Sequence, residues 1–312
     1  MEKKIQKLIS DIIRKDKRAI ARAISMVESE TPESIDLLNR LHNYKNNALR
    51  VGITGPPGAG KSTFTNQLIK MIRNKGKSVG VIAVDPSSPF SGGAILGDRI
   101  RMKDVMLDKD VFIRSMASRG NLGGLARQSV NAAEILEAAG SDIIIFETVG
   151  VGQVEMDVMS AVDTVVLMTV PDAGDVIQTM KAGIMEIGDI FVVNKADLSG
   201  AKRMFDDIEY MLSLRPKIEN WLPPIHLTKA LNGDGIADVL EDIFRHFNYL
   251  DESGQLLEKR RQRIKDKIKS LVNDRIIRNY WDDETLKFLD DYIENEIKNI
   301  SPYQIAEELL KE

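Results

Sequence analysis

The sequence predicts an α/β protein: a doubly wound, mainly parallel sheet with helical extensions at both termini. Between residues 48 and 250, short β-branched runs alternate with amphipathic helical segments, the order of strands and crossover helices in a parallel sheet. Two runs, residues 143–146 and 165–168, are apolar throughout, as strands covered on both faces must be. Charged segments with helical spacing of apolar residues flank this region. We therefore expect helical extensions at 1–47 and 251–312 around a sheet domain at 48–250.

Composition narrows the class of protein. With 312 residues, of which 43% are hydrophobic, the chain can bury a substantial core. It has no cysteine, which fits a reducing compartment, no secretory signal pattern, and no apolar run near the ~20 residues of a membrane-spanning helix. The 43 basic and 47 acidic residues are interspersed, so no basic patch indicates nucleic acid. We expect a cytoplasmic protein that binds neither nucleic acid nor membrane.

The N-terminal extension is expected to be an antiparallel helix pair that packs on the sheet domain. Apolar residues from Ile5 to Ile24 have helical spacing, and a second helix can begin with Thr31 as N-cap and Pro32 at its first position. Strands are expected to follow at residues 49–54, 79–84, 111–113, 142–146, 164–170, 189–193 and 224–227. Ligands of such sheets bind beyond the carboxyl ends of the strands, so polar residues there are candidate site residues.

A phosphate-binding loop follows the first expected strand. Residues 55–62 spell G-x-x-x-x-G-K-S, and the apolar residues after them share one helical face. The glycines allow positive φ and close approach of backbone N–H groups to phosphate oxygens at a helix N-terminus. Lys61 is expected to reach the β- and γ-phosphates, and Ser62 to ligate Mg²⁺. These features predict a P-loop NTPase core with nucleotide contacts from Gly55, Pro56, Pro57, Gly58, Ala59, Gly60, Lys61, Ser62 and Thr63.

A second motif, N-K-A-D at residues 194–197, directly follows a later strand and has the spacing of the guanine-recognition motif N-K-x-D. The carboxylate of Asp197 can accept from both N1–H and the exocyclic amino group of guanine, a pair of donors that adenine lacks. Asn194 is expected to brace the site and Lys195 to cover the base. The segment Thr228, Lys229 and Ala230 matches the element whose backbone meets guanine O6, although Lys replaces the usual Ser. Guanine is therefore the expected base.

Three acidic residues at strand ends, or in the loops after them, are candidates for holding Mg²⁺: Asp85, Asp98 and Glu147. Mg²⁺ prefers oxygen ligands and keeps several waters, so the hydroxyl of Ser62 with nearby carboxylates suits it. For any one acid alone, a helix N-cap or a loop acceptor is an equally good explanation. Their joint placement around the phosphate loop favours the metal.

Long motifs cover most of the chain: GPPGAGKST at 55–63, VDPSSPFSGGAILGDRIRM at 84–102, FIRSMASRGNLGGLA at 112–126, ETVGVGQVEMD at 147–157, DAGDVIQTMKAGIMEIGD at 172–189, and NKAD. Together they resemble the MeaB/ArgK family, G-protein chaperones of adenosylcobalamin-dependent acyl-CoA mutases. The resemblance implies a homodimeric GTPase that binds Mg²⁺ and GTP or GDP. It implies the mutase as partner, with its adenosyltransferase as a further candidate. It also implies three switches, after Asp85, after Glu147 and around residues 172–186.

The chain departs from the family pattern at a few positions. Ile100 and Ala94 stand where Thr and Ser are common, and Ile100 has no hydroxyl to offer a metal. Val151 stands where many GTPases carry a water-orienting Gln, and Gln153 follows two positions later. Slow intrinsic hydrolysis is therefore expected. The expected catalytic residues are Lys61, Asp98, Glu147 and Gln153.

The segment 172–186 is expected to couple the nucleotide state to the partner. It follows an expected strand, and it places Asp172, Asp175, Gln178 and Lys181 among small residues. A capped helix N-terminus explains the two aspartates equally well, and both roles are compatible. Loops that order around a γ-phosphate are a common route from hydrolysis to a global change.

The C-terminal extension contains Leu257, Ile264, Ile268 and Leu271 at roughly heptad spacing. The pattern fits either a helix that lies on its own domain or a dimer interface, and the family resemblance favours dimerisation. Further helices are expected at 283–298 and 301–310. The chain's three histidines are scattered, which favours packing or surface roles over metal ligation.

The function expected from these features is a GTP-binding and GTP-hydrolysing chaperone of an acyl-CoA mutase of the methylmalonyl-CoA mutase type, which gates cofactor loading and release and protects the mutase. Two alternatives have other chemistry. A nickel-insertion metallochaperone GTPase shares the phosphate loop, but such proteins carry Cys or His clusters. A small-molecule kinase would use Lys61 and Mg²⁺ for transfer to an acceptor, but most such kinases use ATP, which N-K-A-D disfavours.

Overall fold

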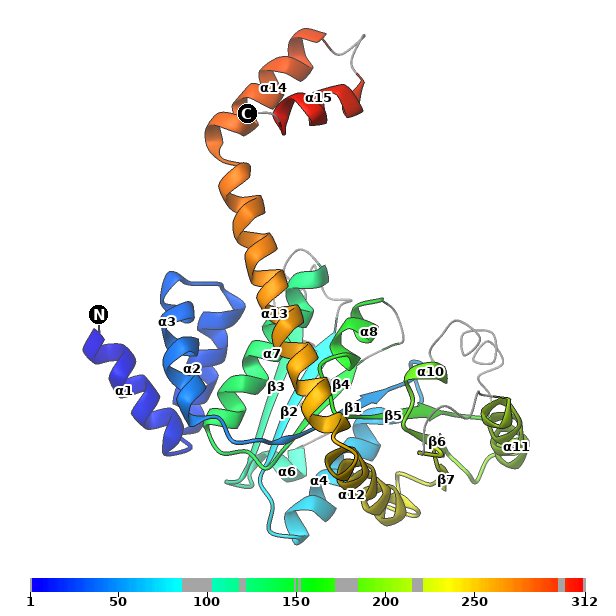
Figure 1. Ribbon diagram of the computed structural model, residues 1–312. Helices are drawn as coiled ribbons and strands as arrows, with labels where there is room; N and C mark the ends of the chain where they lie inside the picture. The colour runs from blue at the N-terminus through cyan, green and yellow to red at the C-terminus, as the bar shows by residue number, and fades with distance from the viewer. Residues whose placement is uncertain are drawn as a thin grey trace. The chain divides into compact units, whose positions relative to one another are not determined.

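The computed structural model describes residues 2–85, 103–117, 122–148, 150, 153–171, 185–214, 221–296 and 301–310. Within them, parallel strands form a 7-stranded sheet in the order β3-β2-β4-β1-β5-β6-β7 (Figure 1). The strands are β1 (Leu49–Thr54), β2 (Val79–Asp85), β3 (Val111–Ala117), β4 (Ile143–Thr148), β5 (Thr164–Thr169), β6 (Ile190–Asn194) and β7 (Ile225–Thr228). The predicted α/β class and parallel sheet are confirmed.

The strand bounds follow the sequence patterns closely, with one larger difference at β3. This strand was expected to end at residue 113, but its main chain pairs with β2 as far as the partners Asp85 and Ala117. The reason is local: Arg114 and Ser115 break the apolar run, although backbone pairing does not require apolar side chains. The longer β3 carries its carboxyl end level with that of β2.

Helices cover both faces of the sheet, so consecutive strand residues enter different cores. On one face, Ile144 and Phe146 pack in a core with α7 and α8, and Leu167 packs with α11. On the other face, Ile143 and Ile145 pack with α4 and α12. These helices are α4 (Lys61–Asn74), α7 (Leu122–Ala138), α8 (Gln153–Met159), α11 (Ala201–Ser213) and α12 (Ile236–Glu252), with the short α6 (Lys103–Met106) and α10 (Met185–Ile187) between strands.

The N-terminal extension packs on α7, as expected, but it is not a helix pair. It consists of α1 (Glu2–Ile13), α2 (Lys17–Glu28), α3 (Pro32–Leu41) and the single 3-10 turn η1 (His42–Tyr44). The first predicted helix is broken because Lys15 has a φ of 63° and the side chain of Asp16 accepts from the Ala19 amide at 2.7 Å, which caps α2. Apolar spacing runs through this break, so periodicity alone does not mark it. The predicted N-cap Thr31 and first helical residue Pro32 are confirmed.

The chain divides into two compact units, Met1–Lys259 and Arg260–Glu312. In the second unit, α14 (Asp283–Glu296) and α15 (Pro302–Leu309) enclose an apolar cavity of about 550 Å³ with the last turns of α13 (Gln255–Tyr280). The Tyr280 hydroxyl donates to the Leu309 carbonyl and ties α15 to the end of α13. None of the described helices combines the length and apolarity that crossing a membrane requires.

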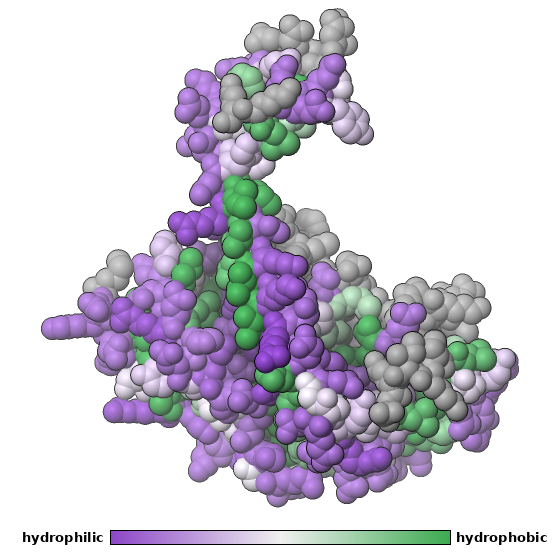
Figure 2. Space-filling model, viewed as in Figure 1, coloured by the Kyte–Doolittle hydropathy of each residue, from purple (hydrophilic) through white to green (hydrophobic). Residues whose placement is uncertain are grey.

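The long helix α13 carries an exposed apolar line. Leu257, Ile264, Ile268 and Leu271 are each about half exposed to solvent, and Figure 2 shows apolar side chains gathered in a row over this helix. Exposed apolar side chains in a contiguous row mark interaction surfaces more often than isolated ones do. This row is the one that the heptad spacing predicts.

Candidate functional site

The phosphate loop connects the carboxyl end of β1 to the first residue of α4, Lys61. Its backbone needs glycine at both ends. Gly55 has a φ of 146°, and a Cβ atom there would lie 2.1 Å from the carbonyl oxygen of Met168. Gly60 has a φ of 87°, and its Cβ would lie 2.5 Å from Nδ2 of Asn194. The loop is therefore pressed against β5 and against the residue that ends β6, which holds it at the N-terminus of α4.

Lys61 is 7% exposed and folds back over the loop that precedes it. Its ammonium group donates to the carbonyl oxygens of Gly55 at 2.7 Å and Pro56 at 2.9 Å. Both acceptors belong to the phosphate loop, so the ammonium group is held close to the N-terminus of α4. A lysine held at a helix N-terminus beside free backbone amides is suited to phosphate oxygens.

The side chains of Ser62 and Glu147 meet at the carboxyl edge of the sheet. Ser62 lies in the first turn of α4, and Glu147 is near the end of β4, the strand paired with β1. The Ser62 hydroxyl donates to Oε1 of Glu147 at 2.6 Å, and the two residues are 7% and 5% exposed. A buried hydroxyl and a buried carboxylate that lie within hydrogen-bond distance of each other supply hard oxygen donors, which Mg²⁺ prefers.

A cavity of about 450 Å³ lies over the loop and its neighbours. Its walls come from the phosphate loop, the end of β2 and the end of β4, and Lys195 closes one side. The lining residues are Pro57, Gly58, Gly60, Lys61, Ser62, Thr63, Ala83, Val84, Glu147, Thr148 and Lys195. The cavity therefore joins the phosphate loop to the residue after Asn194 at the carboxyl edge of the sheet, as the strand order requires.

Asn194 connects the two loops that the sequence motifs define. Its amide nitrogen donates to the carbonyl oxygen of Ala59 at 2.8 Å, and its Oδ1 accepts from the Thr228 hydroxyl and the Ala230 amide, each at 3.0 Å. The Asn194 side chain is 2% exposed, so these bonds form away from water. One side chain thus sets the distance between the phosphate loop and the loop after β7.

Lys195 and Asp197 lie on the exposed side of that link. Lys195 has a φ of 55°, an unusual backbone conformation for a residue with a side chain, and it lines the cavity. Asp197 is exposed. The Ala196 amide donates to the Thr228 carbonyl at 3.0 Å, and Lys229 pairs through its backbone with Asp234. The loop geometry leaves Asp197 accessible to a ligand.

The model of a protein family described as methylmalonyl Co-A mutase-associated GTPase MeaB matches residues 20–285 of this chain. The chain belongs to the MeaB family. The relatives include a putative GTPase of Pyrococcus horikoshii, which is 46% identical over 98% of each chain, and the GTPase ArgK of Escherichia coli, which is 36% identical over 87% of this chain and 85% of its own length. A crystal structure of an LAO/AO transport system kinase superposes with a TM-score of 0.74 at 28% identity, covering 100% of this chain and 98% of that one.

As a member of the MeaB/ArgK family, the chain is a P-loop GTPase. The structure brings the phosphate loop, Glu147, Asn194, Lys195, Thr228 and Ala230 to one edge of the sheet. The backbone of Asp85 ends β2 at the same edge, and Gln153 is the first residue of α8, but their side chains are not among those described. The predicted residues Asp98, Asp172, Asp175, Gln178 and Lys181 lie outside the described residues, as do the departures Ala94, Ile100 and Val151.

Sequence reasoning missed two site-adjacent threonines. Thr54 ends β1 and Thr148 ends β4, and their hydroxyls lie 2.9 Å apart. Each sits directly beside a residue of a predicted motif, Gly55 or Glu147, which is the only signal the sequence carries. Their pairing depends on β1 and β4 being neighbours, and strand order is not visible in local pattern.

Proposed function

We propose that this MeaB-family GTPase binds GTP in the cavity over the phosphate loop, and serves as a chaperone that gates cofactor loading and release on an adenosylcobalamin-dependent acyl-CoA mutase. The observation that carries the proposal is the family match over residues 20–285, whose description names methylmalonyl-CoA mutase. A relative from Caenorhabditis elegans, named methylmalonic aciduria type A homolog, mitochondrial, is 33% identical over 98% of this chain and 82% of its own length. The mutase is therefore the proposed partner, with its adenosyltransferase as a further one.

The triphosphate end is proposed to lie against Lys61 and the amides of the loop. Lys61 is buried between the loop carbonyls that hold it, so its charge is aimed at the same position as the N-terminus of α4. Charge stabilisation by such preorganised groups supplies most of the catalysis in phosphoryl transfer. Gln153, at the start of α8, is proposed to orient the attacking water.

Mg²⁺ is proposed to be held by the hydroxyl of Ser62 and the carboxylate of Glu147, with Asp85 and Asp98 as further carboxylates. The oxygen donors of Ser62 and Glu147 already meet at 2.6 Å in a buried place, which fits a hard cation. When bound, Mg²⁺ would neutralise charge on the phosphate oxygens. The chain's own part is to hold Ser62 on α4 and Glu147 on β4 in fixed relation.

Guanine is proposed to bind between Lys195 and the loop after β7. The exposed carboxylate of Asp197 would accept from N1–H and the amino group of the base, and Ala230 already donates its amide to Asn194. Asn194 would then serve as the fixed link between phosphate and base subsites. Thr228 and Lys229 complete the loop.

The exposed line on α13 is proposed to be the surface through which two copies of the chain pair. Its apolar residues Leu257, Ile264, Ile268 and Leu271 repeat at the spacing of a helix-helix seam. Sedimentation of the parent and of Ile264→Lys measures this directly: the parent should run as a dimer and the variant as a monomer.

The partner proposal is tested by GTP hydrolysis with and without purified methylmalonyl-CoA mutase. The mutase should accelerate hydrolysis by the parent, and a nonhydrolysable GTP analogue should block adenosylcobalamin transfer to the mutase. Gln178→Ala and Lys181→Ala should keep the parent's GDP affinity but lose most of the acceleration, because the segment 172–186 is proposed to contact the partner in one nucleotide state. Lys202→Ala, an exposed lysine on α11, is the matched control. A rate that the mutase leaves unchanged would remove the chaperone proposal.

A further inference from the structure

Two threonine hydroxyls hold one carbonyl oxygen behind the cavity. Thr54 and Thr148 are 2% and 1% exposed, and they occupy neighbouring positions on β1 and β4. The Thr54 hydroxyl lies 3.0 Å from the carbonyl oxygen of Gly150, the Thr148 hydroxyl lies 3.2 Å from the same oxygen, and the two hydroxyls lie 2.9 Å apart. We call Thr54 and Thr148 the threonine pair.

The donor count shows what the carbonyl of Gly150 does for the pair. Two hydroxyls have two protons, and the three contacts of this cluster can use both only if one proton goes to the Gly150 carbonyl. If that carbonyl moved away, one buried hydroxyl would keep its proton without an acceptor in the cluster. A buried polar group left unsatisfied is costly, so the pair favours one position of the Gly150 peptide.

The threonine pair lies between the phosphate loop and the strand end that carries Glu147. Thr54 is followed directly by Gly55 of the phosphate loop, and Thr148 follows Glu147 and lines the cavity itself. The held residue, Gly150, leads into α8, which lies close on β1: a Cβ atom at Gly52 would lie 2.4 Å from Sδ of Met159. Gly150 and Met159, on either side of this stretch of chain, therefore both lie against β1.

We propose that the threonine pair is a positioning device for GTP hydrolysis, which holds the Gly150 carbonyl beside the strand end that leads into the phosphate loop. The proposal rests on the proposed function in one respect, that the cavity is the nucleotide site. The pair acts through the Gly150 carbonyl. Its loss should slow the hydrolytic step and leave GDP binding intact, because the phosphate loop and Asn194 do not depend on it.

The experiment compares Thr54→Val and Thr148→Val, which keep side-chain shape and remove one hydroxyl each. Single-turnover hydrolysis of bound GTP should fall about tenfold in each variant, the rate equivalent of one hydrogen bond. GDP affinity should stay at the parent's value. The double variant should be slower than either single one, because the hydroxyl that remains in each single variant can still donate to the Gly150 carbonyl. Thr54→Ser and Thr148→Ser keep the hydroxyl and should restore the rate.

Thr169→Val is the matched control. Thr169 ends β5, is also almost fully buried, and its hydroxyl has no hydrogen-bond partner among the described residues, so its loss should leave hydrolysis unchanged. Valine variants that hydrolyse GTP at the parent's rate would overturn the proposal, as would slowing that serine fails to restore. Failure of the proposed nucleotide site is a separate result, because the parent itself would then bind no GDP.

Discussion

The two edges of one sheet are built from the same strands and serve different ends. At the carboxyl edge, the buried charges of Lys61 and Glu147 contact neutral carbonyl and hydroxyl groups, and a cavity of about 450 Å³ lies beside them. At the amino edge, buried charges contact one another. The Arg50 guanidinium donates to Glu137 at 2.9 Å, and Asp163 accepts from the Arg50 amide at 2.9 Å. Buried charge lines a cavity at one edge and is paired within the protein at the other.

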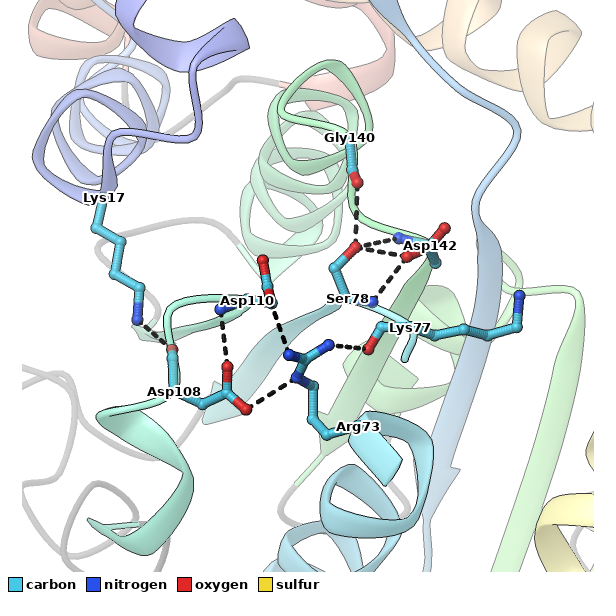
Figure 3. A network of polar contacts seen from close by, with 8 residues as sticks. All are labelled: Lys17, Arg73, Lys77, Ser78, Asp108, Asp110, Gly140 and Asp142. Carbon is cyan, nitrogen blue, oxygen red and sulfur yellow. Dashed lines mark hydrogen bonds and ion pairs between the residues drawn. The ribbon is translucent and has the colours of Figure 1, made fainter. Parts of the chain in front are cut away.

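At a second part of the amino edge, charged side chains again pair with groups of the protein itself (Figure 3). Arg73, in the last turn of α4, donates to Asp108 at 2.9 Å and Asp110 at 2.8 Å, and Lys17 of α2 donates to the carbonyl of Asp108 at 2.7 Å. The hydrogen bond from Arg73 lowers the pKa of Asp108 below its ordinary value. Beside it, Asp142 accepts from both the amide and the hydroxyl of Ser78 at 2.7 Å.

The difference follows from how the chain leaves the strands. At the carboxyl end of β1 it enters the glycine-rich phosphate loop at the N-terminus of α4, where anions can be bound. At the amino ends it arrives from helices through short polar turns, and side chains pair to satisfy the turns. Substitutions at the amino edge should therefore change stability, and those at the carboxyl edge should change nucleotide chemistry.

The largest effect is expected from breaking the Arg50 and Glu137 pair. Burial alone would lower the pKa of the Arg50 guanidinium, but Glu137 raises it, so the ion pair is firmly charged. Arg50→Met leaves Glu137 buried without compensation and should lower the free energy of unfolding by about 3–5 kcal/mol. Urea denaturation measures this. The double variant Arg50→Met with Glu137→Leu should recover most of the loss, and the folded fraction should bind GDP like the parent.

Next comes the loss of charge at the phosphate loop. Lys61→Ala should reduce the rate of GTP hydrolysis by roughly 10²–10³-fold, as removal of one preorganised donor does, while the urea midpoint changes little. The Lys61 ammonium group donates to backbone carbonyls at the wall of the cavity, which water can reach once the side chain is gone. Lys70→Ala, a half-exposed lysine on the same helix, should keep the parent's rate. Unfolding of Lys61→Ala without loss of hydrolysis per folded molecule would reverse the comparison.

Base selectivity is expected to depend on Asp197 by a smaller amount. Asp197→Asn replaces a double acceptor by an amide and should cost about 1–3 kcal/mol in GTP binding, the price of one mismatched buried pair. Xanthosine triphosphate, whose C2 carbonyl suits an amide donor, should bind better than GTP. Competition titrations with both nucleotides give the ratio, and Asp206→Asn on α11 is the surface control. An unchanged preference for GTP would move base recognition elsewhere.

The smallest effect is a pH dependence at the amino edge. Burial lowers the pKa of His246 from 6.5 to about 3. The charge of Lys259 also lowers this pKa, and the charge of Asp163 opposes the shift. Its Nδ1 lies 2.8 Å from the Thr164 hydroxyl, and its Nε2 lies 3.5 Å from Asp189 as a neutral imidazole. Between these pKa values the unfolded chain binds the proton and the folded chain does not. Stability is therefore complete above about pH 6.5 and falls toward pH 3, by at most about 1.4 kcal/mol per pH unit.

His246→Asn should remove this slope, because the amide does not titrate. Urea denaturation of parent and variant at pH 7 and pH 5.5 separates the contribution of His246 from that of the carboxylates. GTP hydrolysis per folded molecule should be equal in the two proteins at both pH values. Equal pH slopes of stability would mean that His246 gains a proton while folded.

The sequence by itself determined the elements and the two binding motifs. The phosphate loop is recognisable because Gly55 and Gly60 occupy backbone conformations that glycine tolerates, and that requirement is local. The strands are recognisable because their side chains enter cores on both faces of the sheet, which requires continuous apolar runs. The first four residues of β4 (Ile143–Thr148) are such a run. The break at Lys15 escaped detection, because apolar spacing continues through it.

Only the tertiary structure decided which strand ends meet. Ser62 and Glu147 are separated by 85 positions, and Asn194 and Ala59 by 135, yet each pair shares a hydrogen bond. The same holds for the threonine pair at the carboxyl edge and for Arg50 with Glu137 at the amino edge. Local periodicity records how a segment is buried, whereas such contacts depend on the order of strands in the sheet. That order, in which β1 lies between β4 and β5, is set by the packing of the whole domain and not by any local pattern.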